Sequence, residues 1–290
     1  MKKTIGLLIL LMIYIIAFFA GFGVYMLIPD LVEPFLTLFI CDIVATAVIW
    51  IFGIFLKTAS IYDPYWSVQP PIIYLSTMII FNNFNLGTIL FFIMILIWSI
   101  RLTTNFIITF NDIRYIDWRY KELKEKTGKL YQIVNLLGIH MMPTILVFIA
   151  SLPALVYARG YEFSIFDLIG YVVIIAGILF ELISDINIHK FKKIRKSRNE
   201  IINVGLWKYS RHPNYLGEIL FWYGVFFVML FNRLDHWQWF FEPMLINALF
   251  VFISIPLAEK KLSTYKDGYD EYKKSTRMLI PIPVRSKKEL

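Results

Sequence analysis

Residues 203–224 have the sequence NVGLWKYSRHPNYLGEILFWYG, in which a polar, basic loop runs directly into an apolar segment. Pro213 disfavours a helical conformation at the residue before it and suits the first turn of a helix. The stretch therefore predicts a helix that begins near Asn214 and carries Asn214 and Glu218, four residues apart, on one face. Such a face at the start of an apolar segment indicates a polar site at the edge of a membrane.

The composition of the whole chain supports a membrane location. Of the 290 residues, 58% are hydrophobic and 17% are charged, which is too apolar for a soluble domain and typical of a polytopic, all-α membrane protein. The single cysteine, Cys41, lies in an apolar run. A disulfide framework within the chain is therefore excluded, and a thiol nucleophile is not expected.

Eight apolar stretches are long enough, or nearly long enough, to cross a hydrocarbon core about 30 Å thick. They cover about 4–28, 35–56, 66–81, 86–110, 131–157, 163–183, 214–231 and 239–258. The first is too long for a secretory signal and has no clear cleavage site. We expect residues 1–36 to form an additional, retained span ahead of a main membrane domain over residues 37–290. The third stretch is short and contains Pro70 and Pro71, so seven spans are the alternative to eight.

The basic residues predict the orientation of these spans. With eight spans and the N-terminus inside, 26 of the 29 Lys and Arg residues lie in inside segments, as expected for cytoplasmic loops. Both termini are therefore predicted to be cytoplasmic. Because orientation and anionic head groups explain the basic residues, nucleic-acid binding is not expected. Residues 112–129 are predicted to form a helix at the interface, and the tail after residue 259 to fold back on the cytoplasmic face.

Charged side chains within spans are costly, and each is a functional hypothesis until a structural partner is found. Asp42 stands alone in a predicted helix, and pairing with Arg101 is one interpretation of it. Trp98, Arg101 and Asn105 recur at helical spacing and share one face, which we expect to point into the helical bundle. That face is either a clasp between helices or a ligand contact.

A second polar stripe leads from the membrane to the cytoplasm. Glu181, Asp185, His189 and Lys192 follow at spacings of four, four and three, as on one face of a helix. The stretch around Pro213 adds Lys208, Tyr209, Arg211, His212, Asn214 and Glu218. Together these residues offer cations for phosphates, an aromatic ring for stacking, and amide and carboxylate groups for a ribose or a base. We predict a nucleotide cofactor site built from side chains, since there is no glycine-rich phosphate loop.

The four histidines are scattered, with no two at ligand spacing, so a metal site is not expected. The expected partners are the lipid bilayer and a lipophilic small-molecule substrate. Oligomerisation is left open by the sequence.

The stretch from Gly205 to Glu218 resembles the signature of the steroid 5-alpha-reductase C-terminal family, in its uncharacterised bacterial branch DUF1295. Four further stretches resemble the same family in the same order: WSIRLTTN from Trp98, DWRY from Asp117, ELISD from Glu181, and YKKSTRMLIP from Tyr272. The resemblance covers about residues 37–283. It implies a helical membrane reductase, of the bacterial inner membrane, that binds NADPH from the cytoplasmic side and reduces a conjugated C=C bond in a steroid, isoprenoid or fatty enone.

The same resemblance implies roles for individual residues. Glu181, Asp185, Lys192, Tyr209, Asn214 and Glu218 would line the NADPH site. Hydride addition to an enone builds negative charge on the carbonyl oxygen, so a donor must meet that oxygen. The steroid enzymes use a glutamic acid and a tyrosine, for which Asp63 matches the acid and Trp98 replaces the tyrosine. An indole cannot transfer a proton as a phenol can, so Tyr65 and Tyr115 are candidate substitutes, with Arg101 as a further catalytic candidate.

Two other functions remain open. The element from Arg211 to Gly217 also resembles membrane methyltransferases that act on isoprenylated cysteine or phospholipid amines and bind S-adenosylmethionine. Their tails usually carry paired glutamates, where this chain has Glu259 followed by two lysines. Asp185 ends the Glu-x-x-Ser-Asp stretch 181–185. That stretch, together with those around Asp63 and Arg101, favours the reductase. A lipid transporter or scaffold with intramembrane charges would need no cofactor and is the third hypothesis.

Overall fold

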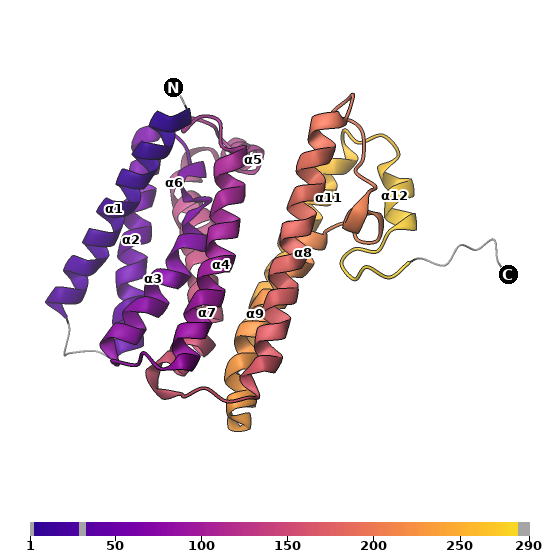
Figure 1. Ribbon diagram of the computed structural model, residues 1–290. Helices are drawn as coiled ribbons and strands as arrows, with labels where there is room; N and C mark the ends of the chain where they lie inside the picture. The colour runs from indigo at the N-terminus through magenta and orange to yellow at the C-terminus, as the bar shows by residue number, and fades with distance from the viewer. Residues whose placement is uncertain (1–2, 29–32, 284–290) are drawn as a thin grey trace. The chain divides into compact units, whose positions relative to one another are not determined.

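The computed structural model describes residues 3–28 and 33–283, and within them the regular secondary structure is helical, apart from an isolated β-bridge between Ser210 and Arg277. The predicted all-α class is confirmed. By its internal contacts the chain divides into two compact units, Met1–Phe163 and Ser164–Leu290. They are called the N-terminal unit and the C-terminal unit below, and Figure 1 shows the helices of each.

The N-terminal unit consists of long apolar helices joined by short connections. Its α-helices are α1 (Lys3–Leu27), α2 (Pro34–Leu56), α3 (Tyr65–Ile80), α4 (Leu86–Thr109), α5 (Trp118–Thr127), α6 (Tyr131–Val134) and α7 (Met142–Gly160). Shorter helical turns cover Ser60–Tyr62 and Gly128–Leu130, and a π-helical segment covers Asn135–Met141. α1 packs along α2, and α3 packs against α4 and α7. The predicted helix within residues 112–129 is α5.

Helix ends in this unit follow local capping signals. At the start of α2, the Glu33 carboxylate accepts hydrogen bonds from the backbone N–H groups of Phe35 and Leu36 at 2.8 and 3.2 Å, and Pro34 occupies the first turn. Both features favour helix initiation. At its other end, Lys57 adopts a left-handed conformation with φ 57°, which is a common way for a helix to stop.

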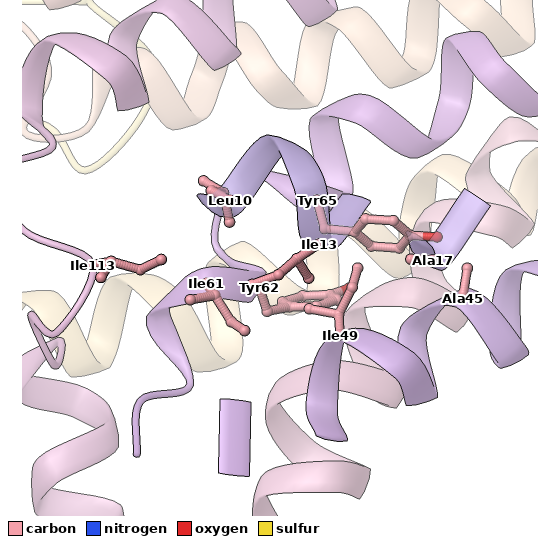
Figure 2. Close-up of a cluster of buried hydrophobic side chains, with 9 residues drawn as sticks. All are labelled: Leu10, Ile13, Ala17, Ala45, Ile49, Ile61, Tyr62, Tyr65 and Ile113. Carbon is pink, nitrogen blue, oxygen red and sulfur yellow. The ribbon is translucent and has the colours of Figure 1, made fainter. Parts of the chain in front are cut away.

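A buried cluster holds α1, α2 and the turn before α3 together (Figure 2). Its members are Leu10, Ile13, Ala17, Ala45, Ile49, Ile61, Tyr62, Tyr65 and Ile113. They come from segments far apart in the sequence, so burial of these apolar side chains defines how α1 and α2 pack on the entry to α3. The phenol of Tyr14 adds a hydrogen bond to the carbonyl oxygen of Ile61 at 2.8 Å.

Seven helical segments of the described chain are long and apolar enough to cross a membrane, judged by length and composition. They are Lys3–Leu27, Pro34–Leu56, Leu86–Thr109, Trp118–Gly160, Asp167–Ile194, Pro213–Asn232 and Leu234–Ser263. The third predicted span became α3, whose 16 residues remain helical through Pro70 and Pro71. At about 1.5 Å per residue α3 falls short of a hydrocarbon core of about 30 Å, so length and composition give seven candidate spans, the alternative number from the sequence. The predicted cytoplasmic location of both termini rests on eight spans and stays a prediction.

The C-terminal unit is built on two antiparallel helices, α8 (Asp167–Ile194) and α9 (Pro213–Asn232). Glycines bring their backbones together: a Cβ added at Gly177 would lie 2.7 Å from the carbonyl oxygen of Gly217, and Gly170 and Gly224 face the same contact. Gly170 and Gly177 are seven residues apart on α8, and Gly217 and Gly224 are seven apart on α9, so the two glycines of each helix lie on one face. Small residues allow such close approach between membrane helices.

The remainder of this unit consists of short helices. They are a 3₁₀ segment Leu234–Phe240, α10 (Phe241–Ala248), a π-helical segment Leu249–Ser254, α11 (Ile255–Ser263) and α12 (Tyr269–Ser275). After α12 the chain returns to the loop before α9. The N–H of Arg211 donates to the carbonyl oxygen of Arg277 at 2.8 Å, and that of His212 to Met278 at 3.1 Å. The tail thus folds back on the loop before α9 as predicted, with backbone contacts at Arg277 and Met278, whereas its position on the cytoplasmic face stays a prediction. α9 begins where Pro213 predicted.

Candidate functional site

In the N-terminal unit, a carboxyl group and a phenol meet from distant parts of the sequence. Asp63 lies just before the start of α3, and the hydroxyl of Tyr120 on α5 donates to Asp63 Oδ1 at 2.5 Å. Burial of the Asp63 carboxyl group, which removes it from water, raises its pKa to about 7, although the Tyr120 hydrogen bond and the Arg119 guanidinium act to lower it. Asp63 therefore titrates near neutral pH, well above the range of an ordinary aspartate.

The loop before α5 positions Tyr120 over Asp63. Thr58 Oγ1 donates to the carbonyl oxygen of Tyr115 at 2.7 Å, and Ser60 Oγ accepts from the N–H of Asp117 at 2.9 Å. Asp117 then caps α5 by accepting from the N–H of Arg119 at 2.9 Å. The turn that leads to Asp63 and the loop that starts α5 are thus joined by hydrogen bonds, which fixes the acid relative to the phenol.

Tyr65 and Tyr115, the predicted phenol substitutes, are placed differently. The hydroxyl of Tyr65 donates to Asp42 Oδ1 at 2.7 Å, and this bond takes the place of the Asp42–Arg101 pairing considered from the sequence. The Tyr115 side chain is 56% exposed. Tyr120 was missed, although it ends the DWRY stretch, because only the folded loop brings it to Asp63.

On α4, the predicted inward face is confirmed at Trp98. Its indole is fully buried and meets the ring of Trp66 edge-on, with 6.2 Å between the ring centres. Arg101 is half-buried one turn further along. Trp98 therefore belongs to the packed interior of the unit.

In the C-terminal unit, Arg211 and His212 are bound to an acid from α11. Arg211 Nε donates to Glu259 Oε1 at 2.7 Å, and His212 Nε2 lies 3.2 Å from the same oxygen. Lys273 approaches the other carboxylate oxygen at 3.2 Å. Arg211 Nη1 also donates to the carbonyl oxygen of Thr276 at 2.5 Å. These contacts use both predicted cofactor residues to fasten the tail to the start of α9.

The loop before α9 also docks on α8. Trp207 Nε1 donates to the carbonyl oxygen of Ser184 at 3.1 Å, and the carbonyl oxygen of Trp207 accepts from the hydroxyl of Tyr272 at 2.5 Å. Gly205 adopts φ +57°, and any Cβ there would lie 2.5 Å from Asn187 Nδ2. The left-handed backbone conformation favours glycine here, and the Asn187 side chain would have to move away from an added Cβ.

Two of the predicted acids lie at the contact between α8 and α9. Glu181 and Glu218 are 2% and 3% exposed. A Cβ at Gly217 would lie 2.5 Å from Glu181 Cγ. The Glu181 side chain therefore lies against α9 at Gly217, the residue before Glu218. Glu218 Oε1 accepts from Trp222 Nε1 at 2.9 Å. Asn214, one turn earlier, is half-buried.

A group of cations gathers where α8 ends. The pKa of Lys266 is lowered by burial and by the nearby charges of Arg195 and Lys192, against the effect of Glu200. Lys266 Nζ donates to the carbonyl oxygen of Arg198 at 2.8 Å. Lys192 was predicted from its spacing, whereas Arg195 and Lys266 were missed, since they join the group only through the folded tail. Mutual repulsion between cations is relieved by an anion.

Two other predicted residues, Lys208 and Tyr209, are exposed beside each other. Lys208 Nζ lies 5.7 Å from the centre of the Tyr209 ring. On α8, Asp185 acts electrostatically on both His189 and Lys192, so these three residues of the predicted stripe are neighbours. Within the described residues, no group of three or more His, Cys, Asp or Glu side chains could hold a metal ion.

A family model described as a protein of unknown function (DUF1295) matches residues 49–276, which is most of the chain. The chain belongs to the DUF1295 family. No curated protein and no solved structure matches it. In this DUF1295 protein, α1 and the beginning of α2 precede the matched residues, which include Asp63, Tyr120 and Glu259.

The candidate residues of the DUF1295 protein thus form two groups, one in each unit. The N-terminal unit carries the acid–phenol pair of Asp63 and Tyr120. The C-terminal unit carries the cations near Lys266 and the polar groups on the facing parts of α8 and α9. The first group suits proton transfer, and the second suits an anionic ligand with polar edges.

Proposed function

We propose that this DUF1295 protein is a membrane-embedded, NADPH-dependent reductase of a conjugated C=C bond in a hydrophobic molecule. The hydrogen bond between Tyr120 and Asp63 is the observation that carries the proposal. A carboxyl group with a pKa of about 7 beside a phenol is a proton donor suited to neutral pH. It supplies the acid and the phenol that enone reduction needs, despite the indole at Trp98.

The C-terminal unit supports the cofactor part of the proposal. Lys192, Arg195 and Lys266 would hold phosphate groups, since they form a cluster of cations whose repulsion is felt at Lys266. The exposed ring of Tyr209 is available for stacking. Glu181, Asp185, Asn214 and Glu218 would bind the polar edges of the ribose and the nicotinamide. When bound, NADPH supplies a hydride to the substrate carbon.

The acid–phenol pair would then supply the proton that the reduction needs. As the substrate gains a hydride at the carbon β to the carbonyl, electrons move onto the carbonyl oxygen. Tyr120 Oη would donate a proton to that oxygen and recover one from the protonated Asp63 carboxyl group, which would then take up a proton from solvent. The enol formed becomes the saturated ketone when its α carbon takes up the proton released from oxygen. The sum is one hydride and one proton added to one double bond.

The proposal is tested by following NADPH consumption with a lipid-soluble enone in purified full-length protein. Asp63→Asn and Tyr120→Phe should each slow turnover by about 10²- to 10⁴-fold, the usual worth of acid catalysis, while NADPH affinity stays near normal. The matched control is Tyr115→Phe, which removes an exposed phenol from the same loop. Unchanged turnover in both variants would overturn the assigned roles.

A methyltransferase that uses S-adenosylmethionine is the second candidate. It is favoured by one contact: Glu259, from the tail region where such enzymes carry glutamates, binds the Arg211–His212 element that resembles theirs. Methyl transfer from labelled S-adenosylmethionine to a phospholipid amine or an isoprenylated cysteine, with no NADPH consumption on any enone, would establish this function in place of the reductase.

A further inference from the structure

A cavity of about 290 Å³ lies between α1, α2 and α3, within the N-terminal unit. Most of its walls are apolar, with Phe18, Leu38, Ile72 and Ile79 among them. Phe18 and Ile79 are 45% and 61% exposed, so the rim belongs to the apolar outer surface that faces hydrocarbon in a membrane. Its volume is close to the lower end of small-molecule pockets, about 300 Å³.

Two buried hydrogen-bond acceptors interrupt the apolar lining. Asp42 and Gln69 both line the cavity and are 5% and 2% exposed. Asp42 Oδ1 accepts from Tyr65, and the side-chain amide of Gln69 lies close enough to act on the Asp42 carboxyl group. By distance and angle, however, Asp42 Oδ2 has no hydrogen-bond partner among the described residues. Gln69 Nε2 donates to the carbonyl oxygen of Thr144 at 3.3 Å, whereas Gln69 Oε1 likewise has no partner there. An acceptor buried without a donor is unfavourable, so a donor from a bound molecule would be stabilised.

A network of side chains holds these acceptors in place. The hydroxyl groups of Tyr62 and Thr46 lie 2.8 and 2.9 Å from Thr144 Oγ1, and Thr144 is also the backbone partner of Gln69. The rings of Tyr62 and Tyr65 pack together with 5.7 Å between their centres, inside the cluster drawn in Figure 2. The acceptors are therefore fixed in advance, which lowers the entropic cost of binding.

We propose that this cavity binds an apolar molecule that carries one hydroxyl group, with the hydroxyl donating to Asp42 Oδ2 or Gln69 Oε1 and the apolar body against the walls. Both unsatisfied groups accept hydrogen bonds, and the polar part of the lining is small, which fits a single donor on an otherwise apolar ligand. The site goes beyond the proposed reductase, since it uses neither Asp63 and Tyr120 nor the C-terminal unit. Asp42 also precedes the residues matched by the family model.

The test uses the full-length protein in lipid nanodiscs and two photoreactive probes: a long-chain primary alcohol with a diazirine, and the methyl ether of the same molecule. The alcohol should label peptides of α1, α2 and α3 about five- to tenfold more than the ether, the factor expected for one hydrogen bond. Asp42→Asn and Gln69→Met should each reduce this preference, and the double variant should remove it. Thr37→Val, a buried change on α2 outside the cavity, should leave it unchanged.

Equal labelling by the alcohol and the ether would overturn the proposal, because it would show only an apolar surface. A preference that survives in the double variant would overturn the role of Asp42 and Gln69. A matched primary amine that labels these helices more strongly than the alcohol would replace the hydroxyl ligand with a cation. If Asp42→Asn does not fold, Gln69→Met alone decides, since it leaves the Asp42–Tyr65 hydrogen bond in place.

Discussion

Replacing Glu259 by alanine should detach the tail from the start of α9. The Glu259 side chain is 11% exposed and binds Arg211 and His212, whose side chains are 10% and 5% exposed. Lys273 adds a third contact, but its side chain is 41% exposed, so its share is small. Removing one partner of a buried ion pair typically costs about 3–5 kcal/mol, because the other charge stays buried. Glu259→Gln keeps an acceptor and should cost about 1–2 kcal/mol.

Hydrogen exchange with mass spectrometry measures the loss of stability at the contact between the tail and the start of α9. The N–H groups of Arg211 and His212 donate to Arg277 and Met278, and they exchange when the tail opens. A loss of about 3 kcal/mol raises the open population about a hundredfold, so residues 211–212 should exchange at least about a hundredfold faster in Glu259→Ala.

The matched control is Glu271→Ala, which removes an exposed carboxylate from α12 of the same tail. Its exchange at residues 211–212 should stay close to that of the unaltered protein. A less than threefold change in Glu259→Ala, or the same acceleration in the control, would refute the conclusion that Glu259 fastens the tail.

Two further predictions concern packing and pH. Gly217→Ala should destabilise the contact between α8 and α9 by about 1–3 kcal/mol, since its Cβ would lie 2.6 Å from the Gly177 carbonyl oxygen; thermal unfolding in detergent should show this loss, and Gly23→Ala, where a Cβ meets nothing within 4 Å, should show none. For Asp63, burial raises the folded-state pKa from 3.8 to about 7, so the folded state binds this proton more tightly than the unfolded state. Stability contributed by Asp63 should therefore fall as pH rises from about 4 to about 7 and level off above, and turnover that needs the protonated acid should fall above about pH 7. Flat profiles for both in the unaltered protein, or unchanged profiles in Asp63→Asn, would exclude these effects.

Features set by local sequence were predictable in this protein. Pro213 marks the start of α9 because its ring fixes a helical φ and lacks an N–H group that the first turn does not need. The long apolar runs became helices because only internal hydrogen bonding satisfies a backbone in hydrocarbon. α3 shows where local signals fail to predict the structure, because its two prolines did not break the helix. It is not a candidate span because it has only 16 residues.

The contacts at the candidate site depend on segments far apart in the sequence. Tyr120 reaches Asp63 only because the loop before α5 docks on Thr58 and Ser60, and no spacing rule contains that information. The sequence likewise offered Arg211 and His212 as ligands for a phosphate. Folding of the tail instead brings Glu259 to both, so the two side chains are bound within the protein.

The central claim, a nicotinamide cofactor bound by the C-terminal unit, is tested most directly by fluorescence titration of NADPH with the purified full-length protein. A saturable change in NADPH fluorescence is predicted, lost in Asn214→Ala and Glu218→Ala and retained in Asp63→Asn. Saturable binding of S-adenosylmethionine with no response to NADPH would contradict the account.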